Sequence, residues 1–150
     1  LYIEPLKAKF LTKVTAQRTK PDWARTIQAL VNERYPDTEK IVLIMDNLNT
    51  HVGASLYETF EPKEARRLLD KLEIHYTPKH GSWLNIAEIG LSMLSRQCLD
   101  RRIGEAETLT QEVAAWTKKS NGAHKKIDWQ FTTTDARIKL KRLYPTILGL

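Results

Sequence analysis

The sequence predicts a mixed α/β domain of 150 residues, in which a mixed sheet with parallel later strands is flanked by helices. Two observations lead to this fold class. Short β-prone runs alternate with helical patterns over the first two-thirds of the chain, and strands joined through helices are usually parallel. The hydrophobic content of 41% is enough for one core of ordinary size, so we expect a single domain over residues 1–150.

The first part of the chain, up to Asp46, is predicted to contain three strands and one helix. Residues 2–6 and 10–16 read as adjoining strands, because both runs are β-prone and the second alternates. An amphipathic helix then begins at a Thr19 cap with an early proline and acid. The apolar run at residues 40–46 predicts a buried parallel strand that ends at Asp46.

The second half is predicted to be mainly helical. We expect a helix over residues 61–72, a short strand over 74–77, a long helix over 82–99, a helix over 108–119, an extended piece over 127–131 and a last helix from 132. Ser82, Thr108 with Gln111, and Thr132 are the predicted caps of these helices. Glu88 then falls in the second turn of the long helix, and Gly90 is expected to loosen that helix.

Composition and charge restrict the class of protein. No apolar run approaches the ~20 residues of a membrane span, and the start has no leader pattern, so we expect a cytoplasmic protein with no membrane partner. The lone Cys98 excludes an internal disulfide. Residues 1–88 hold 13 basic against 12 acidic side chains, whereas residues 89–150 hold 11 against 6. This asymmetry suggests a polyanionic partner that meets mainly the second half.

Asp46 and Glu88 are the candidate catalytic and metal-binding residues. Asp46 ends a predicted parallel strand, where ligands collect in α/β sheets, and Glu88 lies on a helix. Two carboxylates on rigid elements can hold Mg²⁺ or Mn²⁺, and paired metals can clamp the attacking and leaving oxygens of a phosphodiester. In the alternative interpretation, Asp46 only caps a turn and Glu88 is solvated; their spacing alone does not separate the two.

The residues between these acids suggest contact with nucleic acid. Lys79 and His80 stand beside the run Gly81-Ser82-Trp83, a combination suited to phosphate contact and base stacking. His51 and His80 are weak zinc candidates, because no further ligand stands at a zinc-site spacing. Hydrolase, nucleotide-binding and dehydrogenase fingerprints are absent from the sequence.

Four strings carry a family resemblance: IMDNLNTH (44–51), SLYETF (55–60), YTPKHGSWLNIAE (76–88) and QCLDRR (97–102). With these the chain resembles the catalytic domain of a bacterial insertion-sequence transposase of the mariner-related DDE superfamily, over nearly its whole length. The resemblance implies a ribonuclease H-like fold and an acid triad. That triad binds two Mg²⁺ (or Mn²⁺) ions, which activate water and then a DNA 3′ hydroxyl.

The resemblance assigns roles residue by residue. It makes Asp46 the second acid and Glu88 the third, and Asn85 matches the asparagine of a Leu-Asn-x-x-Glu signature. It implies DNA partners, namely transposon ends and target, a location at the nucleoid, and a homodimer for the full-length parent. The expected nucleic-acid contacts are Asn47, Asn49, His51, Lys79, His80, Ser82, Trp83, Asn85, Arg101 and Arg102.

The chain departs from the family pattern at its start. The family's first Asp lies on a first strand that precedes anything in residues 1–150, and Glu4 is not its replacement. The usual helix-turn-helix region is also missing, so the sequence resembles a C-terminal fragment or a decayed copy. We therefore expect a sheet without its central first strand, with either a new pairing or a vacant slot beside the 40–46 strand, and no catalysis by this segment alone.

Two other functions stay open. The chain could be a non-catalytic DNA-binding or assembly module that uses its basic C-terminal helices, or a ribonuclease H-like nuclease that acts on RNA or Holliday junctions. Asp46→Ala, in a chain that includes the missing acid, separates the DNA-binding module from a catalytic domain. A catalytic domain would lose its DNA cleavage, whereas the module would keep its DNA affinity and has no cleavage to lose.

Overall fold

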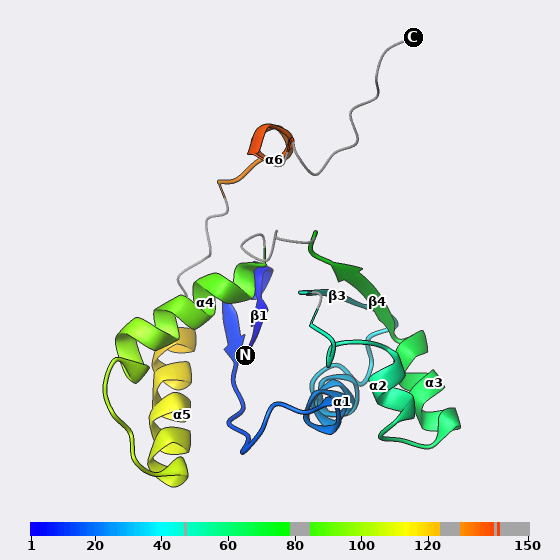
Figure 1. Cartoon of the computed structure of the whole chain (residues 1–150), viewed down its shortest axis with the longest axis horizontal. Coiled ribbons are helices and arrows are strands. Elements are labelled where there is room, and N and C mark those ends of the chain that lie inside the picture. Colours follow the sequence, from blue (N-terminus) through cyan, green and yellow to red (C-terminus); the bar gives the residue numbers. More distant parts are fainter. Residues whose placement is uncertain (47, 79–84, 124–129, 140, 142–150) are drawn as a thin grey trace.

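The computed structural model describes residues 1–46, 48–78, 85–123, 130–139 and 141, and confirms a mixed α/β fold compatible with a ribonuclease H-like arrangement (Figure 1). The strands are β1 (Tyr2–Glu4), β2 (Lys9–Leu11), β3 (Ile41–Met45) and β4 (Leu72–Tyr76), and the helices are α1 (Lys20–Ala29), α2 (Ala54–Tyr57), α3 (Pro62–Asp70), α4 (Ile86–Leu94), α5 (Ala106–Gly122) and α6 (Thr133–Lys139). Five-residue π-helical turns extend α1 to Arg34 and α4 to Leu99.

The described strands form two separate pairs. β1 and β2 are antiparallel, with Ile3 opposite Phe10, whereas β3 and β4 are parallel, with Leu43 opposite Ile74. In Figure 1, β1 and β2 lie with α4 and α5 in one half of the molecule, and β3 and β4 lie with α1, α2 and α3 in the other. Each of the inner strands β1 and β3 therefore keeps one edge without a strand partner within the described residues.

A cavity of about 360 Å³ separates these two pairs. Its walls come from both inner strands, including Ile3 of β1 and Leu43 of β3, and Tyr35 also lines it. The Tyr35 hydroxyl crosses between the two halves and donates to Glu4 Oε2 at 2.7 Å. Of the two arrangements expected for a sheet that lacks its central strand, the structure has the open slot.

The hairpin of β1 and β2 packs one face against each of two hydrophobic clusters. Because side chains alternate along a strand, Tyr2 and Leu11 face the larger cluster, whereas Ile3 and Phe10 face the smaller one. The larger cluster is formed by Trp23, Ala24, Ile27, Leu30, Val31, Leu43, Met45, Leu56, Ala65, Leu68 and Leu72. The smaller is formed by Phe10, Leu94, Cys98, Val113 and Trp116. One hairpin thus joins the two halves.

Several predicted elements differ from the structure near the chain start. The first strand stops at Glu4 rather than at residue 6, because Pro5 begins a short 3-10 turn that Ala8 closes with a left-handed φ of 51°. The second strand ends at Leu11, not at residue 16. The 40–46 run does form a parallel strand, but it is buried on one face only, since Val42 and Ile44 are each 59% exposed.

The helix starts are partly wrong as well. The long helix begins at Ile86 with Asn85 as its cap, so Glu88 lies in the first turn rather than the second. The helix α5 begins at Ala106 after Glu105, earlier than the predicted Thr108 cap. The Thr19 cap of α1 and the Thr132 cap of α6 are confirmed, and each exchanges hydrogen bonds with an aspartate three residues later.

Two further differences concern short elements. The helix α2 was not predicted, and α3 ends at Asp70, so that Leu72 belongs to β4. The expected extended piece at 127–131 lies mostly outside the described residues. Within the described chain, every helix falls short of the length and apolarity that a bilayer span needs.

Candidate functional site

Asp46 lies directly after the last paired residue of β3. Met45 is opposite Tyr76 in the parallel ladder, and the Met45 carbonyl also accepts a hydrogen bond from Thr77 N at 2.8 Å, so the backbone is fixed up to the acid. The carboxylate itself is 42% exposed. In Figure 1 the carboxyl end of β3 points toward the half of the molecule that contains α4. The strand therefore presents an accessible acid at the edge where α/β sheets bind ligands.

His51 holds one oxygen of this carboxylate. Its Nδ1 lies 2.9 Å from Asp46 Oδ1, and the imidazole is half-buried. The His51 ring stacks on Trp23 of α1, with centroids 6.0 Å apart and planes 29° apart. The sequence predicted a nucleic-acid contact for His51, whereas the structure brings it to the candidate catalytic acid. Of the two weak zinc candidates, His51 is thus paired with an acid, and His80 lies outside the described residues.

The backbone of the loop from Asp46 to His51 is fixed at its far end. His51 N donates to Leu48 O at 2.8 Å, and the Tyr76 hydroxyl donates to His51 O at 3.0 Å. Burial raises the pKa of Tyr76, so this hydroxyl keeps its proton and stays a donor across the neutral range. Strand β4 thus holds the main chain of His51, and α1 supports its ring through Trp23.

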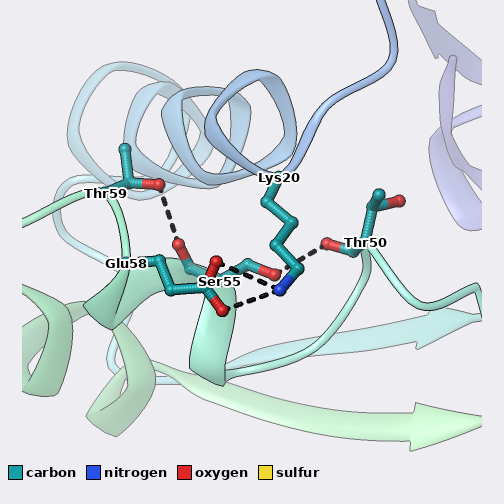
Figure 2. Close-up of polar contacts among 5 residues, drawn as sticks. All are labelled: Lys20, Thr50, Ser55, Glu58 and Thr59. Carbon is teal, nitrogen blue, oxygen red and sulfur yellow. Dashed lines mark hydrogen bonds and ion pairs between the residues drawn. The ribbon is translucent and has the colours of Figure 1, made fainter.

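A second set of polar contacts fastens the loop to α2 (Figure 2). Ser55, which is fully buried, donates to Thr50 O at 3.0 Å, and Thr59 donates to Ser55 O at 2.8 Å. Lys20 of α1 reaches Glu58 at 2.7 and 3.0 Å and joins α1 to the end of α2. The short helix α2 therefore positions the loop that carries His51. The Thr50 hydroxyl is buried and finds no partner among the described residues.

Glu88 is an exposed side chain in the first turn of α4. The Asn85 side chain accepts from Ala87 N at 3.1 Å, and Glu88 N donates to Asn85 O at 2.9 Å, so the signature asparagine also caps the helix. An acid in the first turn is favoured by the positive end of the helix dipole. Ser82, the cap expected from the sequence, lies outside the described residues.

Gly90 sets how closely α4 approaches the hairpin. A Cβ at this position would collide with Ile3 Cδ1 and would lie 3.1 Å from Phe10 Cε1 and 3.2 Å from Leu1 Cδ2. Gly90 therefore serves close packing, a role that the sequence pattern did not indicate. The helix that carries Glu88 is seated on β1 and β2 through this contact.

The other expected nucleic-acid contacts fall into two groups. Asn49 and Arg102 are exposed, and Arg101 is exposed but paired with Glu112 at 2.7 Å. The predicted contacts outside the described residues are Asn47, Lys79, His80, Ser82 and Trp83. A groove of about 1,100 Å³ lies between the extension of α4 and α5. Basic, acidic and apolar side chains line it, among them Arg96, Arg101, Lys119, Asp100, Glu112, Phe10, Met93 and Trp116.

The carboxylate oxygens of Asp46 and Glu88 are of the ligand type that a hard divalent cation binds. In the described chain only His51 bonds to the Asp46 carboxylate, which leaves Oδ2 available, and the Glu88 carboxylate is exposed. Carboxylate oxygens with room for water are the ligands that Mg²⁺ prefers. Two acids are nonetheless fewer than the triad that the resemblance implies.

Comparison with known proteins gives one match. The family described as DDE superfamily endonuclease matches residues 2–110, a span that contains both candidate acids and His51. No curated protein and no solved structure matches the chain.

Proposed function

Since this chain belongs to the DDE superfamily endonucleases, we propose that it forms most of a metal-dependent catalytic domain that cuts and joins DNA at transposon ends. The observation that carries the proposal is the position of Asp46, an accessible acid at the carboxyl end of a parallel strand inside the matched span. The strings around Asp46 and Glu88 further favour an insertion-sequence transposase of the mariner-related group.

Asp46 and Glu88 are the proposed ligands of Mg²⁺ or Mn²⁺. When bound, such ions supply charge stabilisation at a phosphodiester and a reactive hydroxide or DNA 3′ oxygen. The protein itself contributes rigid placement: β3 fixes the backbone before Asp46, and the cap at Asn85 fixes the turn that carries Glu88. Exposed basic side chains at Arg102 and Lys119 are proposed to contact the DNA backbone.

We further propose that residues 1–150 alone do not cut DNA. The resemblance assigns two of three acids to this segment, so the cation charge would be neutralised by one carboxylate fewer. The slot between β1 and β3 fits this view, because the family's first acid lies on a central strand. A homodimer remains the expected form of the complete protein.

The test compares two lengths of the protein with labelled transposon-end DNA and Mg²⁺ or Mn²⁺. The 150-residue chain should leave the DNA intact, and a longer version that supplies the family's first acid should cut it. In the longer version Asp46→Ala should abolish cutting, whereas Asp37→Ala, at an exposed loop position, should not. Cutting that survives Asp46→Ala would remove Asp46 from the site, and cutting by residues 1–150 would refute the proposed inactivity.

A non-catalytic DNA-binding module is the second candidate. It is favoured by the exposed basic residues of the second half, Arg102, Lys118 and Lys119. This candidate predicts DNA affinity without any cutting by the longer version, and no effect of Asp46→Ala.

A further inference from the structure

We infer that His51 is a positioning residue that fixes the Asp46 carboxylate through Nδ1, so that one oxygen is held and the other is presented to a cation. The inference deepens the proposed function and rests on Asp46 being a metal ligand there. It starts from the contact of 2.9 Å between Nδ1 and Oδ1. A carboxylate can only accept a hydrogen bond, so Nδ1 carries the hydrogen in the neutral ring.

The imidazole is suited to this task because it is itself fixed. Trp23 supports one ring face and is 6% exposed, and α1, which carries Trp23, is anchored by the capping box of Thr19 and Asp22. The main chain of His51 is bonded to Leu48 and to Tyr76. A side chain held on several sides loses little further freedom when it orients another group, which makes it an effective outer partner of a metal ligand.

The bond has a geometric consequence for Asp46. A carboxylate at the end of a strand can rotate about its last torsion and is 42% exposed, so nothing else in the described chain selects its orientation. With Oδ1 bonded to His51, Oδ2 is the oxygen left for a cation. Loss of an outer hydrogen bond of this kind typically weakens metal affinity by about 10-fold to 100-fold.

The first measurement concerns the tautomer of His51 and needs neither metal nor activity. Nitrogen-15 NMR of the 150-residue chain at alkaline pH, where the ring is neutral, should show the His51 proton on Nδ1. In Asp46→Ala the proton should move to Nε2, the form that imidazoles favour in water. A wild-type ring protonated on Nε2 would overturn the inference.

The second measurement is Mn²⁺ affinity by calorimetry or electron paramagnetic resonance. We expect His51→Ala to weaken binding at least about 10-fold, and His51→Asn to recover most of the loss, because the asparagine amide nitrogen can take the place of Nδ1. His75→Ala is the matched control, since His75 also pairs with a carboxylate, Glu73 at 2.7 Å, but on an exposed part of β4.

The outcomes separate this inference from the proposed function. Unchanged Mn²⁺ affinity in His51→Ala would refute the positioning role even if the site is catalytic. If the wild-type chain takes up no Mn²⁺, the proposed metal site fails in this segment, and the tautomer then decides whether His51 holds Asp46. Circular dichroism of each variant shows whether it is folded. If His51→Ala is unfolded, the Mn²⁺ affinity of His51→Asn still tests the inference.

Discussion

Replacing Gly90 by alanine tests how α4, and with it Glu88, is seated on the hairpin. The new methyl group would collide with Ile3 Cδ1 and crowd Phe10 and Leu1 at 3.1 and 3.2 Å. Forcing one extra carbon into such a contact typically costs about 1–3 kcal/mol. Alanine gains about 0.5–1 kcal/mol over glycine in a helix, so the opposing term is smaller. We expect a net loss of about 1 kcal/mol in the free energy of unfolding.

Gly122 provides the matched control. It is the last residue of α5, and a Cβ there would meet nothing within 4 Å. Gly122→Ala should therefore show the helix gain without the packing cost, a stabilisation of up to about 1 kcal/mol. Both free energies can be measured by urea denaturation followed by circular dichroism. At this chain length a change of 1 kcal/mol moves the melting temperature by about 2–4 °C.

One result of this comparison would refute the packing of α4 on the hairpin. If Gly90→Ala is as stable as Gly122→Ala, α4 does not pack on β1 and β2 at the described distance. The larger Gly90→Val variant strengthens the test, because its two further methyl groups deepen the same overlap while a β-branched residue also weakens the helix. A graded loss from alanine to valine is expected, and no loss in either variant would refute the packing.

Three further changes probe other parts of the molecule. Asn121→Ala should lower the free energy of unfolding by about 1–3 kcal/mol, because the Asn121 amide bonds both Phe10 N at 2.7 Å and Phe10 O at 3.0 Å and its loss leaves these groups unpaired. An unchanged midpoint of urea denaturation would contradict this. Hydrogen bonds from Arg67 and Gln28 lower the pKa of Glu64 from 4.5 to about 2, so the stability that ionised Glu64 contributes is complete above pH 4.5 and is lost as pH falls toward 2. Glu64→Gln should therefore reduce the loss of unfolding free energy between pH 4.5 and pH 2. Glu39→Gln, at an exposed position, should leave that loss unchanged. Reversing the basic residues of the second half should weaken DNA binding equally across sequences and reduce its salt dependence in filter or fluorescence assays, and unaltered affinity would place the DNA elsewhere. These residues are Arg101, Arg102, Lys118, Lys119, Lys125 and Lys126.

Local signals in the sequence predicted much of the fold. The capping boxes at Thr19 and Thr132 were found because all their partners lie within three residues, and the parallel strand before Asp46 was found from its apolar run. The cap of α4 was placed wrongly, at Ser82, because Asn85 is an equally good cap and residue type alone does not choose between them.

The errors concern features set by tertiary contacts. The burial of Val42 and Ile44 was overestimated, because an apolar run does not reveal whether an element covers each face of the strand. The packing role of Gly90 was missed for the same reason, since its neighbours Ile3 and Phe10 are about 80 residues away in the chain. The site is a similar case: both acids were proposed from pattern and resemblance, but the bond between His51 and Asp46 depends on how the loop folds back.

The hairpin of β1 and β2 divides the molecule into two units of separate local stability. The six paired residues of β1 and β2 lie between the two hydrophobic clusters. Each cluster can therefore open as its own cooperative unit, and its amides should show their own degree of protection against hydrogen exchange. Trp23 reports on the larger unit and Trp116 on the smaller, where its ring lies edge-on to Phe10 at 5.2 Å. A molecule with this division is expected to unfold in stages when the hairpin is weakened.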